Sequence, residues 1–187
     1  MPRAGLSTDV VVAEARRLVD AEGTTALSLA RLAQRFGVAQ PSLYQHVGGV
    51  DDLHGRVAVL ATRDLASALR RAATGRAGRE AVSGVASAYR RYAREHPGSY
   101  GYLLQARPDH PAHAEAAREV LDVLGVVLAG YGIVEESSVV DAVRFLRSAL
   151  HGFVAIEVAG GFAMARPAEA SFERLVDAVQ VALSDWR

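Results

Sequence analysis

The stretch from residue 28 to residue 47, SLARLAQRFGVAQPSLYQHV, contains two short helical patterns separated by a glycine. Ser28 can cap the first pattern, and Gly37 can end it in a left-handed conformation. Pro41 suits the first turn of the second pattern, where a missing N–H is harmless. Two short helices joined by a tight turn can place the second in the DNA major groove. An ordinary helical hairpin with a solvated polar face has the same spacing, so spacing alone leaves both interpretations open.

The second pattern has a face of uncharged side chains that can donate and accept hydrogen bonds. Glutamine can pair with adenine, serine and tyrosine can reach phosphates or base edges, and proline can contact a thymine methyl group. Leu43 and Val47 point back toward a core. The predicted DNA-binding residues are Ser28, Gln40, Pro41, Ser42, Tyr44, Gln45 and His46.

Helical periodicity also dominates the rest of the chain, and no segment alternates like a strand between paired turn signals. The predicted fold class is therefore all-α. Ser7 or Thr8 can cap a first helix that Gly23 ends. Further helices are predicted over residues 51–73, 79–95, 97–106, 111–131, 136–160 and 168–186. We expect a helix-turn-helix domain over residues 1–49 and an effector-binding and dimerisation domain over residues 50–187.

The composition excludes several classes of protein. The 187 residues carry 21 basic and 21 acidic side chains, and every basic one is arginine, so a generally basic nucleic-acid coating is absent. Cysteine is absent as well, which removes disulfides, thiol nucleophiles and thiolate metal sites. We find no signal peptide, no apolar run long enough to span a bilayer and no catalytic motif. The chain is expected to be soluble, cytoplasmic and free of cofactors.

The run SLARLAQRFGVAQPSLYQHVGGVDDLHGRVA, residues 28–58, resembles the DNA-binding domain of the TetR family of bacterial regulators. Within it, residues 40–46 are similar to the recognition helix of the tetracycline repressors. This resemblance implies that the DNA-facing positions are Gln40, Pro41, Ser42, Tyr44, Gln45 and His46. Two positions depart from the family pattern. Val50 stands where a phosphate-gripping lysine is common, and Ala30 stands where the tetracycline repressors have a basic, base-reading residue.

The C-terminal part resembles the family less specifically. Residues 89–100, taken with Leu150-His151-Gly152-Phe153, are similar to the TetR subgroup whose effector domain carries a Trp-His-Gly motif, with Leu150 in place of the tryptophan. His151 lies on an otherwise apolar helix, where it could be a satisfied core histidine or a ligand contact. The residues predicted to bind a mostly apolar effector are Tyr100, Tyr102, Phe145, His151 and Phe153.

The last two predicted helices each carry a broad apolar stripe. One stripe could face the core of the monomer, and the family resemblance implies that these helices pair across a two-fold axis, so we expect a homodimer. The stripes contain Val139, Val143, Leu146, Leu150 and Phe153, and Phe172, Leu175, Val176, Val179, Leu183 and Trp186. His110 and His113 have a spacing that could bind a metal, but Pro111 between them and their surface-like surroundings argue against it, so no metal site is predicted.

These observations favour a homodimeric repressor that a small-molecule ligand releases from a palindromic operator. The main alternative is a ligand-binding or scaffold protein of the same fold that has lost operator binding, which Val50, Ala30 and the neutral charge favour. An enzyme has no constellation of residues to support it.

Overall fold

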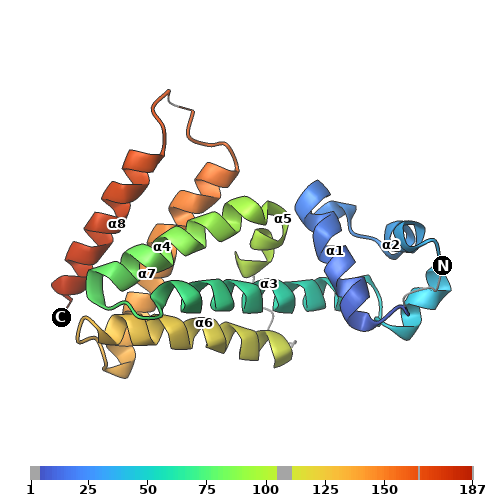
Figure 1. Ribbon diagram of the computed structural model, residues 1–187, viewed down its shortest axis with the longest axis horizontal. Helices are drawn as coiled ribbons and strands as arrows, with labels where there is room; N and C mark the ends of the chain where they lie inside the picture. The colour runs from blue at the N-terminus through green and yellow to red at the C-terminus, as the bar shows by residue number, and fades with distance from the viewer. Residues whose placement is uncertain (1–4, 105–110, 164, 187) are drawn as a thin grey trace. The chain divides into compact units, whose positions relative to one another are not determined.

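The computed structural model describes residues 5–104, 111–163 and 165–186. Within these ranges every regular element is a helix, so the predicted all-α fold is confirmed (Figure 1). The elements are α1 (Thr8–Glu22), η1 (Thr24–Ala26), α2 (Leu29–Phe36), η2 (Gln40–Gln45), α3 (Val50–Ala73), α4 (Gly78–Glu95), α5 (Pro97–Tyr100), η3 (Gly101–Leu104), α6 (Pro111–Ala129), α7 (Glu136–Val158) and α8 (Glu169–Ser184).

The chain divides into two compact units. Unit 1 contains Met1–Arg63 and His96–Ala116, and unit 2 contains Asp64–Glu95 and Ala117–Arg187. Helices α3 and α6 each contribute residues to both units. The predicted boundary at residue 50 separates a DNA-binding domain from an effector-binding domain. These compact units do not test it, so it stays a prediction.

Local signals set the helix ends in unit 1 as predicted. The Ser7 hydroxyl accepts a hydrogen bond from the Val10 N–H and caps α1, and Ser28 does the same for α2 through the Arg31 N–H, both at 3.3 Å. Gly37 ends α2 with φ +64°, which suits a residue without a Cβ atom.

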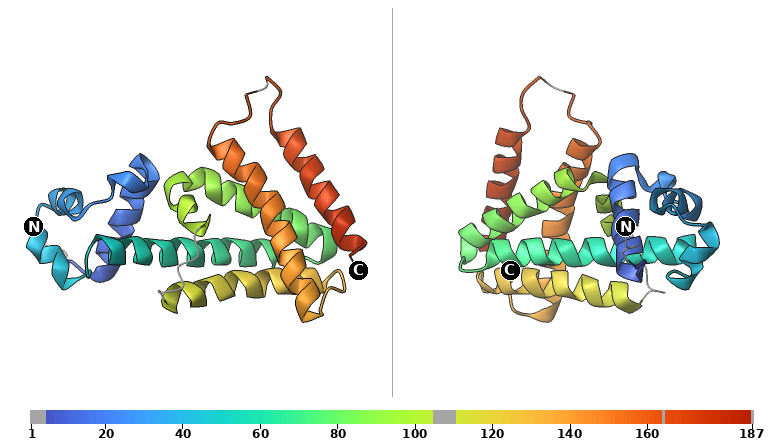
Figure 2. Two further views of the ribbon diagram at one scale, coloured as in Figure 1. Left: turned by 180° about the vertical axis from the view of Figure 1, so that it is seen from behind. Right: turned by 45° about the vertical axis from the view of Figure 1, so that its right-hand side comes forward.

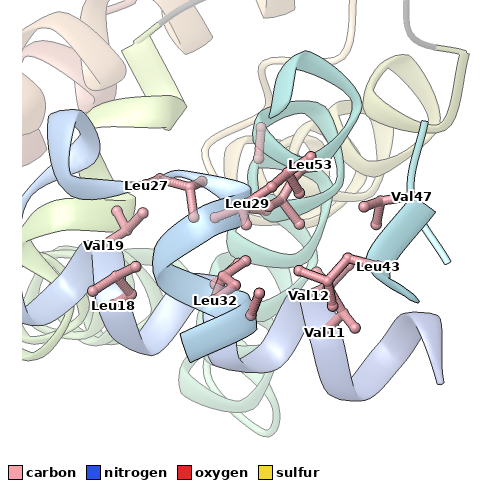
Figure 3. Packing of buried hydrophobic residues seen from close by; sticks show 14 of the residues in the cluster. Val11, Val12, Leu18, Val19, Leu27, Leu29, Leu32, Leu43, Val47 and Leu53 are labelled. Carbon is pink, nitrogen blue, oxygen red and sulfur yellow. The ribbon is translucent and has the colours of Figure 1, made fainter. Parts of the chain in front are cut away.

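Apolar side chains from α1, α2, η2 and the start of α3 form one core in unit 1 (Figure 3). Leu18, Leu32, Leu43 and Leu53 lie among its most deeply buried members. Tyr102, from the distant η3, belongs to the same core.

The segment predicted as the second helix of the pair is a 3₁₀ helix rather than an α-helix. Its turns close through bonds from the Ser42 N–H to the Ala39 carbonyl and from the His46 N–H to the Leu43 carbonyl, each 2.9 Å long. The segment is six residues long and Gly48-Gly49 follows closely, so few i to i+4 bonds can form. The helix predicted over 97–106 is likewise two short pieces, α5 and η3, and residues 105–110 lie outside the described ranges.

In unit 2, α4 packs against α7 and α8, and α7 and α8 lie side by side (Figure 2). Both apolar stripes on the last two helices turn inward within this unit: Leu146, Leu150, Val179 and Leu183 are almost fully buried. These residues build the core of unit 2. Other stripe residues, such as Leu175 and Trp186, are only half-buried, so the homodimer expected from the stripes stays a prediction. The exposed apolar side chains on these helices are different ones: Val140, Ile156 and Val181.

Candidate functional site

The predicted DNA-binding residues of η2 lie on an exposed turn, and buried apolar side chains fix this turn to the core of unit 1. Gln40, Pro41 and Gln45 are exposed, and Tyr44 is 56% exposed. Ser42 and His46 are half-buried, and the His46 carbonyl accepts a 3.0 Å hydrogen bond from the Thr8 hydroxyl of α1. Because Leu43 and Val47 are buried in the core beneath, the turn holds its polar side chains outward on a fixed base.

Ser28 has a structural task besides its predicted contact with DNA. Its side-chain oxygen accepts the Arg31 N–H at the start of α2, outside the η2 turn. A serine hydroxyl can still donate while it accepts, so the cap leaves a donor for a phosphate.

The described arginines of residues 5–56 are paired with carboxylates. Each described arginine in residues 5–56 has a carboxylate partner, as Arg16–Asp20, Arg17–Glu14, Arg31–Glu22, Arg35–Glu14 and Arg56–Asp52. Ala30 and Val50, which stand where related regulators have basic residues, are exposed. The positive charge of these arginines is therefore largely compensated within the chain.

A second feature of unit 1 is the contact between α1 and α5. The Asp20 carboxylate accepts two 2.7 Å hydrogen bonds from the backbone N–H and the hydroxyl of Ser99. The same carboxylate lies 3.2 Å from Nδ1 of His96. Gly98 packs so closely that an added Cβ atom would lie 1.9 Å from the Val19 carbonyl oxygen. Sequence reasoning missed this contact, because no local signal links residues 79 positions apart.

Two predicted effector residues, Tyr100 and Tyr102, are buried in unit 1. The Tyr102 hydroxyl is hydrogen-bonded to Nδ1 of His54 on α3. This pair ties η3 to the first half of α3, so Tyr102 has a structural role in the unit that carries the η2 turn.

The other three predicted effector residues lie in unit 2 but in separate surroundings. His151 Nδ1 is 2.9 Å from the Tyr89 hydroxyl, and burial, with a smaller contribution from Arg147, lowers the pKa of His151. Phe153 packs against Phe162 and Phe172, whereas Phe145 packs against Trp186. Phe145, His151 and Phe153 therefore have different neighbours within unit 2, and the five-residue effector site stays a prediction.

Arg90, which sequence reasoning did not single out, joins three helices of unit 2. Its guanidinium donates to both carboxylate oxygens of Glu157 on α7, at 2.8 and 2.6 Å, and to Glu169 of α8 at 2.6 Å. It also lies 4.6 Å from the ring centroid of Phe172. The Arg90 hydrogen bond lowers the pKa of Glu157, and the same bonds raise the pKa of Arg90. These contacts of Arg90 join α7 and α8 to α4.

No group of three or more metal-ligating side chains forms among the described residues; His113 is buried, and His110 lies outside them. No helix in the described ranges has the length and apolar character needed to cross a membrane.

A capped short helix, a glycine turn and an exposed polar turn on a small core, followed by a helical C-terminal region, define a helix-turn-helix regulator. A family model described as "Tetracyclin repressor-like, C-terminal domain" matches residues 82–179. The chain is 37% identical over 159 residues to the HTH-type transcriptional regulator Rv0681 of Mycobacterium tuberculosis, covering 84% of this chain and 72% of that protein. The chain belongs to the TetR family of helix-turn-helix transcriptional regulators.

Solved structures share the fold. A protein from Rhodococcus sp. RHA1 superposes with a TM-score of 0.84 at 21% identity, covering 99% of this chain and 100% of that one. A TetR variant from Acinetobacter baumannii AYE in complex with minocycline has a TM-score of 0.71 at 21% identity, covering 95% and 96%. At these identities the likeness concerns the fold. The family is not that of an enzyme, and the Trp-His-Gly subgroup remains a resemblance of residues 150–153.

Proposed function

We propose that the chain is a homodimeric repressor that occupies a palindromic operator through the η2 turn and is released by a small, mostly apolar ligand. The observation that carries the proposal is the exposed turn itself. Leu43 is buried beneath the turn, and four residues that could contact DNA are exposed above it: Gln40, Pro41, Tyr44 and Gln45. Tyr44 is 56% exposed and so adds little to the core, whereas its hydroxyl could contact a base or a phosphate.

The experiment that tests this role is truncation of the turn. Tyr44→Ala is expected to weaken operator binding by about 1–3 kcal/mol, because it removes one base or phosphate contact. His46→Ala is expected to do the same while keeping the backbone carbonyl that accepts from Thr8. Binding is measured by fluorescence anisotropy on a duplex selected from a random pool.

Thr25→Ala, at an exposed position of η1 in the same unit, is the control and should bind like the parent. The assignment of the turn would be wrong if both turn variants stayed folded and bound as tightly as the parent.

A second expectation concerns salt. Residues 1–56 contain six arginines and six carboxylates, and the described arginines among them are paired. Few phosphates can then be neutralised, and each contributes about 0.9 to the slope of log affinity against log salt. We expect a slope of magnitude about 4 or less. A slope near 10, measured from anisotropy titrations between low and physiological salt, would show that the ion pairs open to grip phosphates.

The proposed release mechanism uses the contact between α1 and α5. Ser99 and His96 contact the Asp20 carboxylate of α1, so α5 packs in the same unit as the η2 turn. Helix α5 follows directly after α4, which carries Tyr89, the partner of His151. A ligand that displaces α4 therefore acts on α5 through the continuous chain. The minocycline complex of the fold relative supports a small molecule as the kind of effector.

Ligand binding and operator binding must then oppose one another equally. A ligand found by thermal shift should bind about tenfold more weakly, a difference of about 1.4 kcal/mol, when operator DNA is present. His151→Ala is expected to weaken ligand binding and to leave operator binding unchanged when no ligand is present. Calorimetric titrations with and without duplex measure both. Equal affinities in the two titrations would leave a bound molecule without a release mechanism.

A protein of the same fold that no longer binds an operator is the second candidate. The paired arginines and the exposed Val50 favour it. Selection of duplexes from a random pool separates the two, because only the repressor enriches a sequence.

A further inference from the structure

Unit 2 contains an open groove of about 770 Å³ that the proposed repressor function does not use. Residues from the end of α3, from the turn after it, from α4 and from α8 form its walls. The groove is distinct from the surroundings of His151, Phe145 and Phe153, none of which lines it. Its lining is mostly polar, unlike an apolar effector pocket.

Positive charge dominates the lining. Four arginines, Arg71, Arg76, Arg79 and Arg91, face two carboxylates, Glu80 and Asp177. Asp177 is already engaged, because its carboxylate lies 3.6 Å from the Arg79 guanidinium. The groove therefore carries an excess of guanidinium groups in a chain whose overall formal charge is zero.

Three of these arginines lack a carboxylate partner among the described residues. Arg71 donates to the Ser67 hydroxyl, and Arg76 donates to the Ala72 carbonyl. No ion pair within the described ranges involves Arg91. By contrast, each described arginine of residues 5–56 is paired with a carboxylate. With Glu80 also in the lining, the groove holds two more guanidiniums than carboxylates, and a bound anion would offset this excess positive charge.

Close packing of α3 on α4 and a buried polar contact form the floor of the groove. An added Cβ atom at Gly84 would lie 2.7 Å from the Ala72 carbonyl oxygen, so glycine lets α3 and α4 pack closely there. Gln180, only 2% exposed on the otherwise apolar inner face of α8, donates to the Ser83 hydroxyl oxygen at 2.7 Å. Since that oxygen accepts from Gln180, the Ser83 hydroxyl proton remains able to donate to a ligand.

We propose that this groove binds a small anion with at least two negative charges, carried by phosphate or carboxylate groups. Guanidinium groups present planar forks of donors that match both groups in a bidentate manner, and serine hydroxyls add single donors. A second hollow of about 510 Å³ shares Ser87 and Arg91 with the groove. It adds two arginines, Arg90 and Arg94, and two carboxylates, Glu95 and Glu169. The adjoining space can take the remainder of a longer ligand.

The test is isothermal titration calorimetry of the full chain at fixed ionic strength, with pyrophosphate and citrate as separate probes. At least one is expected to bind one per chain with a Kd below about 1 mM. Binding of pyrophosphate assigns phosphate chemistry to the groove, and binding of citrate assigns carboxylate chemistry. Absence of binding by both probes overturns the proposal.

Two matched double variants decide where the anion binds. Arg76→Gln with Arg91→Gln is expected to weaken the probe at least about tenfold, because two charge-assisted contacts are lost. Arg118→Gln with Arg166→Gln removes the same charge from exposed positions outside the groove and should leave the Kd within about twofold. Equal losses in both, or no loss in the first, contradict the assignment. Thermal unfolding without probe verifies that each variant is folded. Failure here leaves the repressor proposal unaffected, since it rests on other residues.

Discussion

Gly98→Ala is expected to lower the free energy of unfolding by about 3 kcal/mol, at the upper end of the usual cost of overpacking. The new Cβ atom would lie 1.9 Å from the Val19 carbonyl oxygen and 2.9 Å from the Asp20 Cα atom. Both are backbone atoms, so no side-chain rotation relieves the clash. Helix α5 must move away from α1, and the hydrogen bonds from Ser99 to Asp20 are lost with it.

Gly101→Ala is the matched control. Gly101 lies three residues further along, has an ordinary helical φ of −57°, and an added Cβ atom there meets nothing within 4 Å. Chemical denaturation of the two variants measures the difference. Equal midpoints for Gly98→Ala and Gly101→Ala would show that α5 does not pack on α1 as described.

Arg90→Gln is expected to cost about 2–3 kcal/mol, below the full cost of breaking a buried ion pair because Glu169 is largely exposed. The side chain of Arg90 is 8% exposed and that of Glu157 is 18% exposed, so the variant leaves a carboxylate half-desolvated without its partner. For a chain of this length the melting temperature should fall by roughly 5–10 °C.

Arg94→Gln, which removes an exposed arginine from the same helix, should change the melting temperature by far less. The double variant Arg90→Gln with Glu157→Gln should regain part of the loss, because neither charge is left buried. A double variant as unstable as the sum of its single changes would mean that the two side chains do not interact.

The same network gives a sign for the dependence of stability on pH. The pKa of Glu157 lies below its usual value in the folded chain, because Arg90 donates to its charged form. The unfolded chain then binds more protons in the window between the two pKa values. The stabilisation is therefore present above the unfolded value and is lost as pH falls through the folded one. Arg90→Gln should flatten this acid-side decline.

Local signals made much of unit 1 predictable from the sequence. Ser7, Ser28, Gly23 and Gly37 act within a few residues of where they stand, so their caps and helix ends could be predicted. The exposed positions of Tyr44 and Gln45 followed from the spacing of Leu43 and Val47. The 3₁₀ geometry of η2 did not, because hydrophobic spacing over six residues does not distinguish a 3₁₀ helix from a short α-helix.

Contacts between residues far apart in the sequence could not be predicted from the sequence alone. Asp20 meets Ser99 across 79 positions, and Arg90 meets Glu157 across 67, with nothing in the intervening sequence to mark either pair. Periodicity on α7 and α8 shows that a face is buried but does not show against what, so the homodimer expected from these stripes stays a prediction. Leu146 and Val179 are buried within the chain, so charged substitutions there would test folding rather than dimerisation.

The most direct test of the account is selection of bound duplexes from a random pool by the full chain and by Tyr44→Ala. If two copies read successive faces of the major groove through the η2 turn, the parent enriches a palindrome whose half-sites are about 10 base pairs, one helical turn of DNA, or a multiple of it apart. Tyr44→Ala then enriches the same sequence weakly or not at all. A parent that stays folded and enriches no sequence would contradict operator binding by the η2 turn.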